Sequence, residues 1–156
     1  MNFEKLSYNP ETGIFVWAGS GHKITKGKVA GRYAGIGYKQ IQYEKKYYLA
    51  HRLAWFLFYG EWPKGNIDHI NGVKDDNRIA NLRDVSQSTN KQNTITAYSN
   101  NKSGFLGVSR CKDSQKWLAQ ILIDKKVKRL GLFDSAEKAH EAYLEEKRKN
   151  HEGCTI

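Results

Sequence analysis

Cysteine, proline and long apolar runs are scarce in this 156-residue chain. Its two cysteines, Cys111 and Cys154, form no C-x-x-C pair, which excludes a cysteine-rich zinc site and argues against a disulfide framework. The longest apolar run, residues 53–58, is far shorter than the roughly 20 residues of a membrane-spanning helix. No apolar segment typical of a signal peptide occurs near the N-terminus. We therefore expect a protein of a reducing, cytoplasmic interior with no membrane partner.

Acidic side chains are also fewer than basic ones. The chain has 16 Asp and Glu and 26 Lys and Arg, which give a formal net charge of +10. Residues 1–48 carry eight basic and three acidic side chains, residues 49–95 six and five, and residues 96–156 twelve and eight. Two basic flanks thus enclose a nearly neutral middle. Such flanks favour salt-dependent binding to a polyanion, since each neutralised phosphate releases condensed counterions. The alternative is that the basic excess serves solubility alone.

Residues 1–50 are predicted to form β structure. Residues 9–13 have turn chemistry (Asn-Pro-Glu-Thr-Gly), and a short strand follows them. The alternation of aromatic and branched side chains over residues 38–49 predicts a hairpin. Residues 51–59 are predicted as a short buried helix that ends at Gly60.

Residues 104–156 are predicted to form a three-stranded antiparallel sheet packed on one C-terminal helix. The predicted strands are residues 104–111, 116–124 and 126–133, and the predicted helix is residues 135–150. Trp117, Ala119 and Ile121 alternate to one side of the middle strand, where an alanine stripe of the helix should cover them. The opposite sheet face stays open, and residues 96–103 are an unpatterned polar linker. The expected fold class is α+β.

The middle of the chain holds the most informative pattern, an Asp-His pair followed by two spaced asparagines. The predicted elements are a strand at 66–70, a polar loop at 71–81, a second strand at 82–85 and a helix at 86–93. His69 lies at the end of the first strand, Asn81 follows twelve residues later, and Asn90 lies nine residues beyond that. One small unit therefore carries an imidazole, a carboxylate and two amides.

This combination suits metal-assisted cleavage of a phosphodiester. His69 is the candidate general base, because an imidazole has an unperturbed pKa near neutrality. Asp68 and Asn90 offer hard oxygen ligands that suit Mg²⁺, with Mn²⁺ as the alternative ion. Neighbours on a strand point to opposite faces, so Asp68 needs a twist or bulge to reach an ion beside His69. The alternative for this pair is a turn with a surface histidine.

Other polar residues compete for roles in this unit. Asn81 is expected to hold the loop through hydrogen bonds to its backbone. Asn77 and Asn93 compete with Asn81 and Asn90, but their spacing fits less well. His51 opens the predicted helix, and its role is open between a packing residue, a phosphate contact and a further member of the site.

Three motifs occur together here: Asp-His-Ile-Asn-Gly at 68–72, Asp-Asn-Arg at 76–78 and Asn-Leu-Arg at 81–83. With the preceding His-Arg-Leu-Ala-Trp at 51–55, they resemble the HNH (His-Me finger, ββα-metal) endonucleases of the phage and homing type. The resemblance covers residues 1–95. It implies a nuclease domain over that range, with a β-rich N-terminal part at 1–50 and a ββα-metal core at 66–95.

The resemblance also implies roles for the four polar residues. His69 would be the general base and Asn81 would order the catalytic loop. Asp68 and Asn90 would bind one divalent metal ion, with Asn90 standing where many members of the family have His. Cleavage would leave 5′-phosphate and 3′-hydroxyl ends.

Residues 103–150 resemble the plant ethylene-response-factor (Apetala-type) DNA-binding domain. The motifs are Phe-Leu-Gly-Val at 105–108, Lys-Trp-Leu-Ala-Gln-Ile at 116–121, Leu-Gly-Leu-Phe at 130–133 and Ala-Glu-Lys-Ala-His-Glu-Ala-Tyr at 136–143. The resemblance implies a domain at 104–156 whose open sheet face enters the major groove. Several arginines of that family are missing, and Gln120 and Arg129 remain as base contacts. The other expected DNA contacts are Lys102, Arg110, Lys112, Lys126 and Lys128.

Together these features predict a metal-dependent endonuclease that hydrolyses double-stranded DNA. One active site per chain predicts nicking by a monomer without a protein partner, in a phage or homing-type enzyme of the infected host cytoplasm. The alternative is a catalytically inactive, sequence-specific DNA-binding regulator. A second alternative is an RNA-binding or RNA-cleaving protein.

Overall fold

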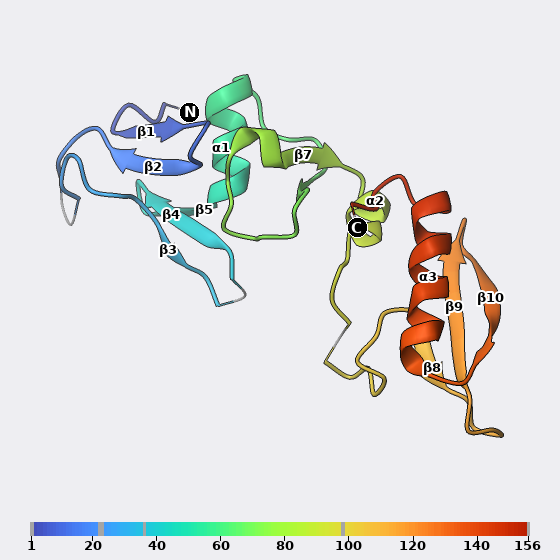
Figure 1. Cartoon of the computed structure of the whole chain (residues 1–156). Coiled ribbons are helices and arrows are strands. Elements are labelled where there is room, and N and C mark those ends of the chain that lie inside the picture. Colours follow the sequence, from blue (N-terminus) through green and yellow to red (C-terminus); the bar gives the residue numbers. More distant parts are fainter. Residues whose placement is uncertain (1, 22–23, 36, 98, 156) are drawn as a thin grey trace. The chain divides into compact units, whose positions relative to one another are not determined.

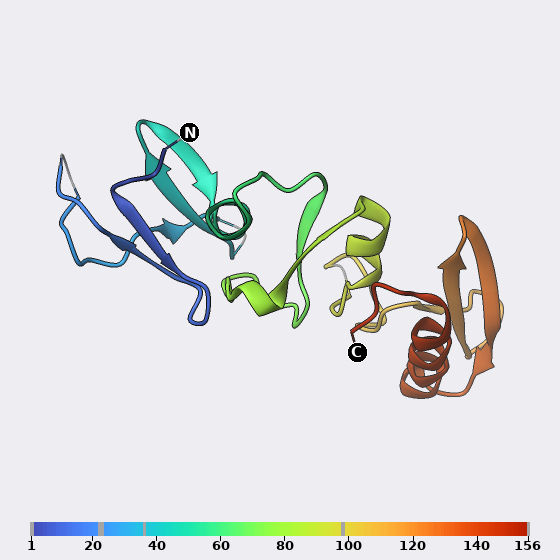
Figure 2. The same ribbon diagram turned by 90° about the horizontal axis from the view of Figure 1, so that it is seen from above.

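The computed structural model has a mixed α+β fold with several small antiparallel sheets, which confirms the predicted fold class. It describes residues 2–21, 24–35, 37–97 and 99–155. The chain divides into two compact units, residues 1–87 and 88–156, and each is described by itself (Figures 1 and 2). The domain limits inferred from the sequence stay predictions. Among the described residues, no helix has both the length and the apolar composition that a bilayer crossing requires.

The first unit begins with two small sheets. Strands β1 (Leu6–Asn9) and β2 (Ile14–Trp17) form an antiparallel hairpin around the predicted turn. Strands β3 (Arg32–Tyr33), β4 (Lys39–Tyr43) and β5 (Lys46–Leu49) form the second sheet in that order. The predicted hairpin of residues 38–49 is confirmed. Glu44 and Lys45 make its two-residue turn with φ of 48° and 66°, the backbone that matches strand twist.

Helix α1 (Ala50–Tyr59) follows directly and confirms the predicted helix. Leu53 and Ala54 are fully buried in the core of this unit. The helix ends at Gly60, whose φ of 79° suits glycine and whose N–H donates to the Phe56 carbonyl. The core also contains side chains of β1, β2 and β4, among them Leu6, Phe15 and Ile41. The same core includes Ile67 and Leu82 of the two strands that follow.

Strands β6 (Asn66–His69) and β7 (Leu82–Val85) pair antiparallel, with Asp68 opposite Arg83 and His69 opposite Leu82. The loop between them holds a short 3₁₀ helix at Ile79–Asn81, so it is more regular than the polar loop that the sequence predicted. The helix α2 (Gln87–Gln92) comes next, and all but its first residue belong to the second unit.

The second unit has strands β8 (Val108–Arg110), β9 (Trp117–Ile123) and β10 (Lys126–Phe133) in the order β10-β9-β8. Helix α3 (Ala136–Asn150) covers one face, and Ser135 caps it by accepting the Lys138 N–H at 3.3 Å. The predicted three-stranded sheet on one helix is confirmed. Strand β8 is shorter than the predicted 104–111, because side chains of the preceding loop, such as that of Ser103, take up the backbone hydrogen bonds there.

The core of the second unit lies between the sheet and α3. Ala119 and Ile121 are buried on β9, and the alanines of the helix stripe lie against that face. Trp117 packs at the edge of this core, as its place in the alternation predicted. The other face carries apolar side chains in solvent, since Leu122 is 58 % and Val127 is 63 % exposed.

Candidate active site

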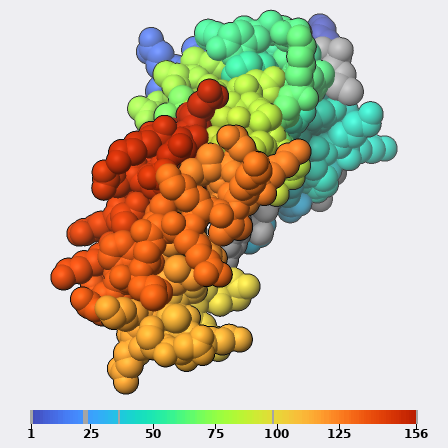
Figure 3. All heavy atoms as spheres, turned by 90° about the vertical axis from the view of Figure 1, so that its right-hand side faces the viewer, coloured from blue at the N-terminus to red at the C-terminus, as the bar shows by residue number. Residues whose placement is uncertain are grey.

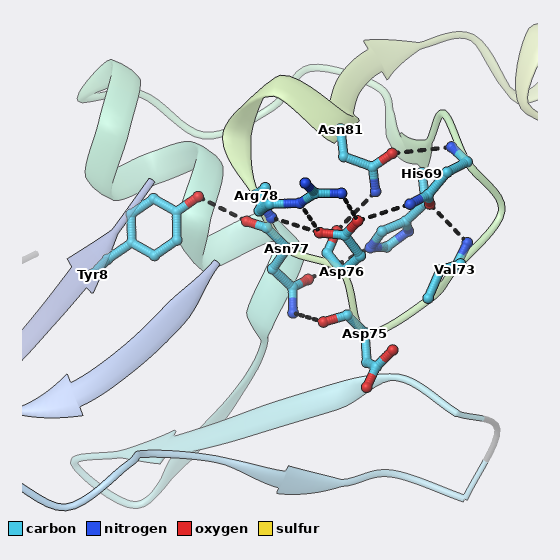
Figure 4. A network of polar contacts seen from close by, with 9 residues as sticks. Tyr8, His69, Val73, Asp75, Asp76, Asn77, Arg78 and Asn81 are labelled. Atoms are coloured by element: carbon cyan, nitrogen blue, oxygen red, sulfur yellow. Dashed lines mark hydrogen bonds and ion pairs between the residues drawn. The ribbon is translucent and has the colours of Figure 1, made fainter. Parts of the chain in front are cut away.

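His69 lies at the end of β6 in the first unit and is only 4 % exposed (Figure 4). Its Nε2 lies 3.5 Å from the Asn77 side-chain oxygen. The rings of His51 and Tyr38 pack against it, with centroids 5.2 Å and 5.9 Å from that of His69. The imidazole is therefore buried, but among polar and aromatic groups and not in an aliphatic pocket.

The surroundings of His69 keep it neutral. Burial is the largest influence and lowers its pKa below the ordinary value of 6.5. The Asn77 side chain and three carboxylates act in the opposite direction, those of Asp68, Asp76 and Asp75. Because the net direction is downward, the neutral imidazole predominates at neutral pH, and the neutral form is the one that a general base requires.

Asp68 is buried beside His69 in sequence and pairs with Arg83 across the two strands. Its Oδ2 accepts hydrogen bonds from Arg83 Nε at 2.8 Å and from Arg83 Nη2 at 2.7 Å. The strand register is regular here, without the bulge that the sequence analysis considered. Any cation that Asp68 binds must share the carboxylate with this guanidinium.

Asn81 ties the two ends of the loop together (Figure 4). Its side-chain oxygen accepts the Asn71 N–H at 3.0 Å, and its side-chain nitrogen donates to the Asp76 carbonyl at 2.9 Å. Its own carbonyl accepts the Ile70 N–H at 2.9 Å. These hydrogen bonds shape the loop that follows His69, and they do so without requiring contact between Asn81 and a reacting group.

Asp76 is a further organiser of this loop that the sequence analysis did not assign. Its carboxylate accepts from Asn71 Nδ2 at 2.7 Å and from Arg78 Nε at 2.8 Å. The hydrogen bond from Arg78 is the largest influence and lowers the pKa of Asp76 to about 2. The Asp-Asn-Arg triplet was visible in the sequence, but only the folded loop shows that Asp76 and Arg78 bind each other.

His51 packs against the candidate base. Its ring meets that of His69 edge-on and lies 5.1 Å from Tyr38. Burial lowers the pKa of His51 to about 3, so this second imidazole is also neutral. Its Nδ1 is buried with no hydrogen-bond partner among the described residues. Of the three roles that the sequence left open, packing is the one that these contacts display.

The two predicted metal ligands lie in different units, because Asn90 sits on α2 and Asp68 on β6. Their approach to a common ion stays a prediction. Their donor atoms, a carboxylate oxygen and an amide oxygen, fit a hard divalent cation such as Mg²⁺. Within the described part of the chain, no three His, Cys, Asp or Glu side chains gather as a ready-made metal site.

The predicted DNA contacts of the second unit fall on both sides of its sheet. Arg129 and Gln120 are opposite each other in the register of β10 and β9, in line with the exposed Val127 and Leu122. Three other expected contacts, Lys102, Lys112 and Lys126, are exposed. Figure 3 shows strand residues in orange beside α3 in red.

Two of the expected DNA contacts are engaged within the unit. The Arg110 guanidinium lies over the Trp117 ring at 4.9 Å, and Trp117 belongs to the helix-covered side. Lys128 Nζ forms an ion pair with Glu146 of α3 at 2.7 Å. Neither side chain lies with Arg129 on the outer face of the sheet, the face that α3 does not cover. The sequence pattern alone did not assign the predicted DNA contacts to different faces.

A cavity of about 690 Å³ lies elsewhere in the first unit, in the N-terminal sheets. Its lining includes Trp17, Tyr43 and three cations, which are Lys5, Arg32 and Lys45. It contains none of the predicted catalytic or metal-binding residues. This cavity is therefore separate from the cluster of polar side chains around His69.

Comparison with known protein families supports this location for the site. Residues 48–92 match the model of the HNH endonuclease family. The matched segment contains α1, β6, β7 and α2. No curated protein and no solved structure matches the chain. The match does not reach residues 104–156, so no comparison supports the Apetala-type resemblance of the second unit. HNH nucleases act on DNA and generally use a divalent metal ion. The match therefore supports an HNH nuclease domain within residues 48–92 of this chain.

Proposed function

We propose that this protein is a metal-dependent endonuclease that hydrolyses phosphodiester bonds in double-stranded DNA. The observation that carries the proposal is the buried, neutral imidazole of His69, set beside Asp68 inside the segment that matches the HNH family. The wider chain supports a nucleic-acid substrate, because its net charge is +10.

His69 is assigned the role of general base. It takes a proton from the attacking water, and positioned groups of this kind contribute about 10²–10⁴-fold to rate. Asp68 and Asn90 would hold one divalent ion, for which Mg²⁺ is the expected species and Mn²⁺ the alternative. Such an ion supplies charge neutralisation at the phosphate and the leaving oxygen. The family resemblance favours 5′-phosphate and 3′-hydroxyl products.

The second unit is assigned the task of holding DNA through the outer face of its sheet, in the manner of an Apetala-type domain. Arg129 and Gln120 form a neighbouring donor pair on that face and are proposed to contact bases. The exposed lysines Lys102, Lys112 and Lys126 are proposed to contact phosphates, which position DNA without specifying sequence. Arg110 and Lys128 would have to leave their partners Trp117 and Glu146 to take part.

One general base per chain implies that a monomer nicks one strand at a time. We place the protein with the phage or homing-type HNH enzymes that act in a bacterial cytoplasm. This assignment follows the motif resemblance and the HNH family match.

Incubation of supercoiled plasmid with the full chain tests the proposal. We expect open-circular product with Mg²⁺, none with excess chelator, and none from a His69→Ala variant that still retards duplex DNA on a gel. If the wild-type protein binds duplex DNA but leaves plasmid intact with Mg²⁺ and with Mn²⁺, the protein is a DNA-binding regulator and the proposal fails. Preferential binding and cleavage of single-stranded RNA would likewise overturn the DNA assignment.

A further inference from the structure

The cavity in the N-terminal part of the first unit is lined by residues of both sheets there (Figure 1). Trp17 ends β2, Gln40 and Gln42 lie on β4, and Lys45 lies in the turn that leads to β5. The cavity volume of about 690 Å³ falls within the roughly 300–1,000 Å³ of small-molecule sites. A ligand of the size of one nucleotide therefore fits.

Two aromatic rings form part of the cavity lining. The rings of Trp17 and Tyr43 are nearly parallel, with an interplanar angle of 18° and centroids 6.3 Å apart. Tyr43 is buried in the core, whereas Trp17 is only half-buried. The Trp17 ring therefore keeps surface on which a planar ligand ring can stack, and every nucleic-acid base can make such a contact.

Two side-chain amides with spare hydrogen-bonding capacity also line the cavity. Gln40 and Gln42 are two residues apart on β4, so their side chains point to the same side of the strand. Within the described part of the chain, neither amide has a hydrogen-bond partner. A glutamine amide both donates and accepts, which matches the mixed donors and acceptors on the edge of a base.

The charge of the lining is mainly positive. Lys5, Arg32 and Lys45 line the cavity together with one carboxylate, that of Glu44. Among the described residues none of these three cations forms an ion pair, whereas other cations of this unit pair with aspartates. The Arg32 guanidinium lies 5.0 Å from the centroid of the Tyr47 ring, a contact that does not neutralise its charge. The lining is therefore complementary to an anionic group.

We propose that this cavity is a binding site for one nucleoside phosphate. The base stacks on Trp17 and is recognised by the amides of Gln40 and Gln42, while Lys5 and Arg32 hold the phosphate. The site shares no residue with the proposed cleavage machinery, and its occupancy does not require the proposed function. A free mononucleotide and an unpaired nucleotide of a DNA strand offer the same chemistry, and the test distinguishes these two sources.

The first test uses the ¹⁵N-labelled full-length protein in the presence of a chelator, so that no DNA is cleaved. The four 2′-deoxynucleoside 5′-monophosphates are titrated while proton–nitrogen correlation spectra are recorded. The indole signal of Trp17 and the side-chain amide signals of Gln40 and Gln42 should shift and saturate. The indole signal of Trp117 in the second unit is the internal control and should not move.

Two short duplexes then identify the source of the nucleotide. One is fully paired, and the other has the same stem with one unpaired nucleotide. Shifts at Trp17 with the second duplex but with no mononucleotide assign the site to a nucleotide of a DNA strand. The inference is overturned if neither kind of ligand moves the Trp17 signal, or if the fully paired duplex moves it as strongly as the other duplex. Inorganic phosphate that binds as tightly as the nucleotide also overturns it, because the cavity is then an anion site alone.

Charge variants show whether the cavity cations matter by their position. The double variant Lys5→Ala/Arg32→Ala should raise the Kd of the nucleotide ligand about tenfold in isothermal titration calorimetry, since each exposed ion pair contributes a small factor. Lys28→Ala/Lys46→Ala is the matched control, because it removes the same charge from exposed positions that do not line the cavity. Its Kd should equal that of the wild type. An equal loss of affinity in both double variants contradicts the inference.

Variants of Trp17 test the stacking contact. Trp17→Leu removes the aromatic ring and should weaken binding roughly tenfold, as loss of one base-stacking contact does. Trp17→Phe keeps a ring and should retain most of the affinity. Thermal melts establish that each variant is folded. A folded Trp17→Leu protein with wild-type affinity contradicts the inference, whereas a protein that binds nucleotide here but never nicks plasmid contradicts only the proposed function.

Discussion

The two units have the same charge but arrange it differently. Each of the ranges 1–87 and 88–156 contains thirteen basic and eight acidic side chains. In the first unit three carboxylates, those of Asp68, Asp75 and Asp76, influence one buried imidazole. In the second unit the arginine expected to contact bases lies on an open sheet face, and the ion pairs of α3 are at the surface.

Under the proposed function, the basic charge of both units indicates a polyanionic ligand, and the burial of His69 indicates where the reaction takes place. A buried group has its pKa shifted by desolvation and neighbours, as His69 and His51 show. An exposed cation such as Arg129 is proposed to act through attraction to phosphate or to base edges. Substitutions in each unit separate these two contributions.

The largest expected effect is the loss of the base. His69→Ala should lower the nicking rate at saturating DNA by about 10²–10⁴-fold, because a positioned base contributes this factor. Plasmid nicking assays with Mg²⁺ measure the rate, and gel retardation measures affinity for duplex DNA, which should not change. A parallel loss of affinity would mean that His69 holds DNA, and the separation of roles between the units would fail.

The second prediction concerns binding. Arg129→Ala should weaken the Kd for duplex DNA by roughly tenfold or more, as loss of a base contact does, with kcat at saturating DNA unchanged. Lys128→Ala is the matched control on the neighbouring position, because Lys128 is occupied by Glu146 and its loss should weaken binding less. Fluorescence anisotropy at several salt concentrations measures both variants. An equal loss in both would show that the outer face is not the binding face.

The third prediction concerns a buried cation in the second unit. Lys147 is 1 % exposed, and its Nζ donates to the Thr94 carbonyl at 2.6 Å, which ties α3 to the segment after α2. Lys147→Ala should lower the free energy of unfolding by about 1–3 kcal/mol, because it leaves a carbonyl unpaired and a space in the core. Denaturant titration measures the change. The exposed Lys149→Ala is the control and should leave the unfolding midpoint almost unchanged.

The smallest expected effect is on the pH dependence of stability. Asp76 has a folded pKa of about 2 against an ordinary value of 3.8, so it stabilises the fold above the unfolded pKa. This contribution is lost as the pH falls through about 2. Asp76→Asn should therefore melt at a lower temperature than the wild type at pH 5 to 7, and the two melting curves should converge towards pH 2. A gap that stays constant with pH would mean that the charge of Asp76 does not hold the loop.

The order of elements around the site was predictable from the sequence, because it depends on local patterns. Turn chemistry at residues 9–13 predicted a turn before a short strand, and alternation over 38–49 predicted a hairpin. Gly60 marks the end of α1. The alanine stripe of α3 predicted which face of the sheet it covers. The same local reasoning overextended β8, since it could not see that Ser103 binds the backbone of the loop before it.

The partners of the site residues were not predictable. Spacing ranked Asn77 below Asn81, yet the folded loop directs the Asn77 amide at His69. The sequence left three roles open for His51, and only the structure shows that its ring lies against that of His69. These contacts join positions from separate strands, helices and turns, and no periodicity records which side chains meet across a core.

The sequence by itself therefore determined the class of fold, the strand–loop–strand–helix unit and the residue types on which the proposed cleavage depends, because periodicity, turn residues and side-chain chemistry are local properties. Only the tertiary structure decided that His69 is buried and neutral, that Asp68 is shared with Arg83, and that Lys128 is bound to α3. The reason is that burial and hydrogen-bond partners depend on packing between segments that are distant in the chain. The hydrogen bond from the Tyr8 hydroxyl to the Asn77 carbonyl also depends on such packing, since the two residues lie 69 positions apart.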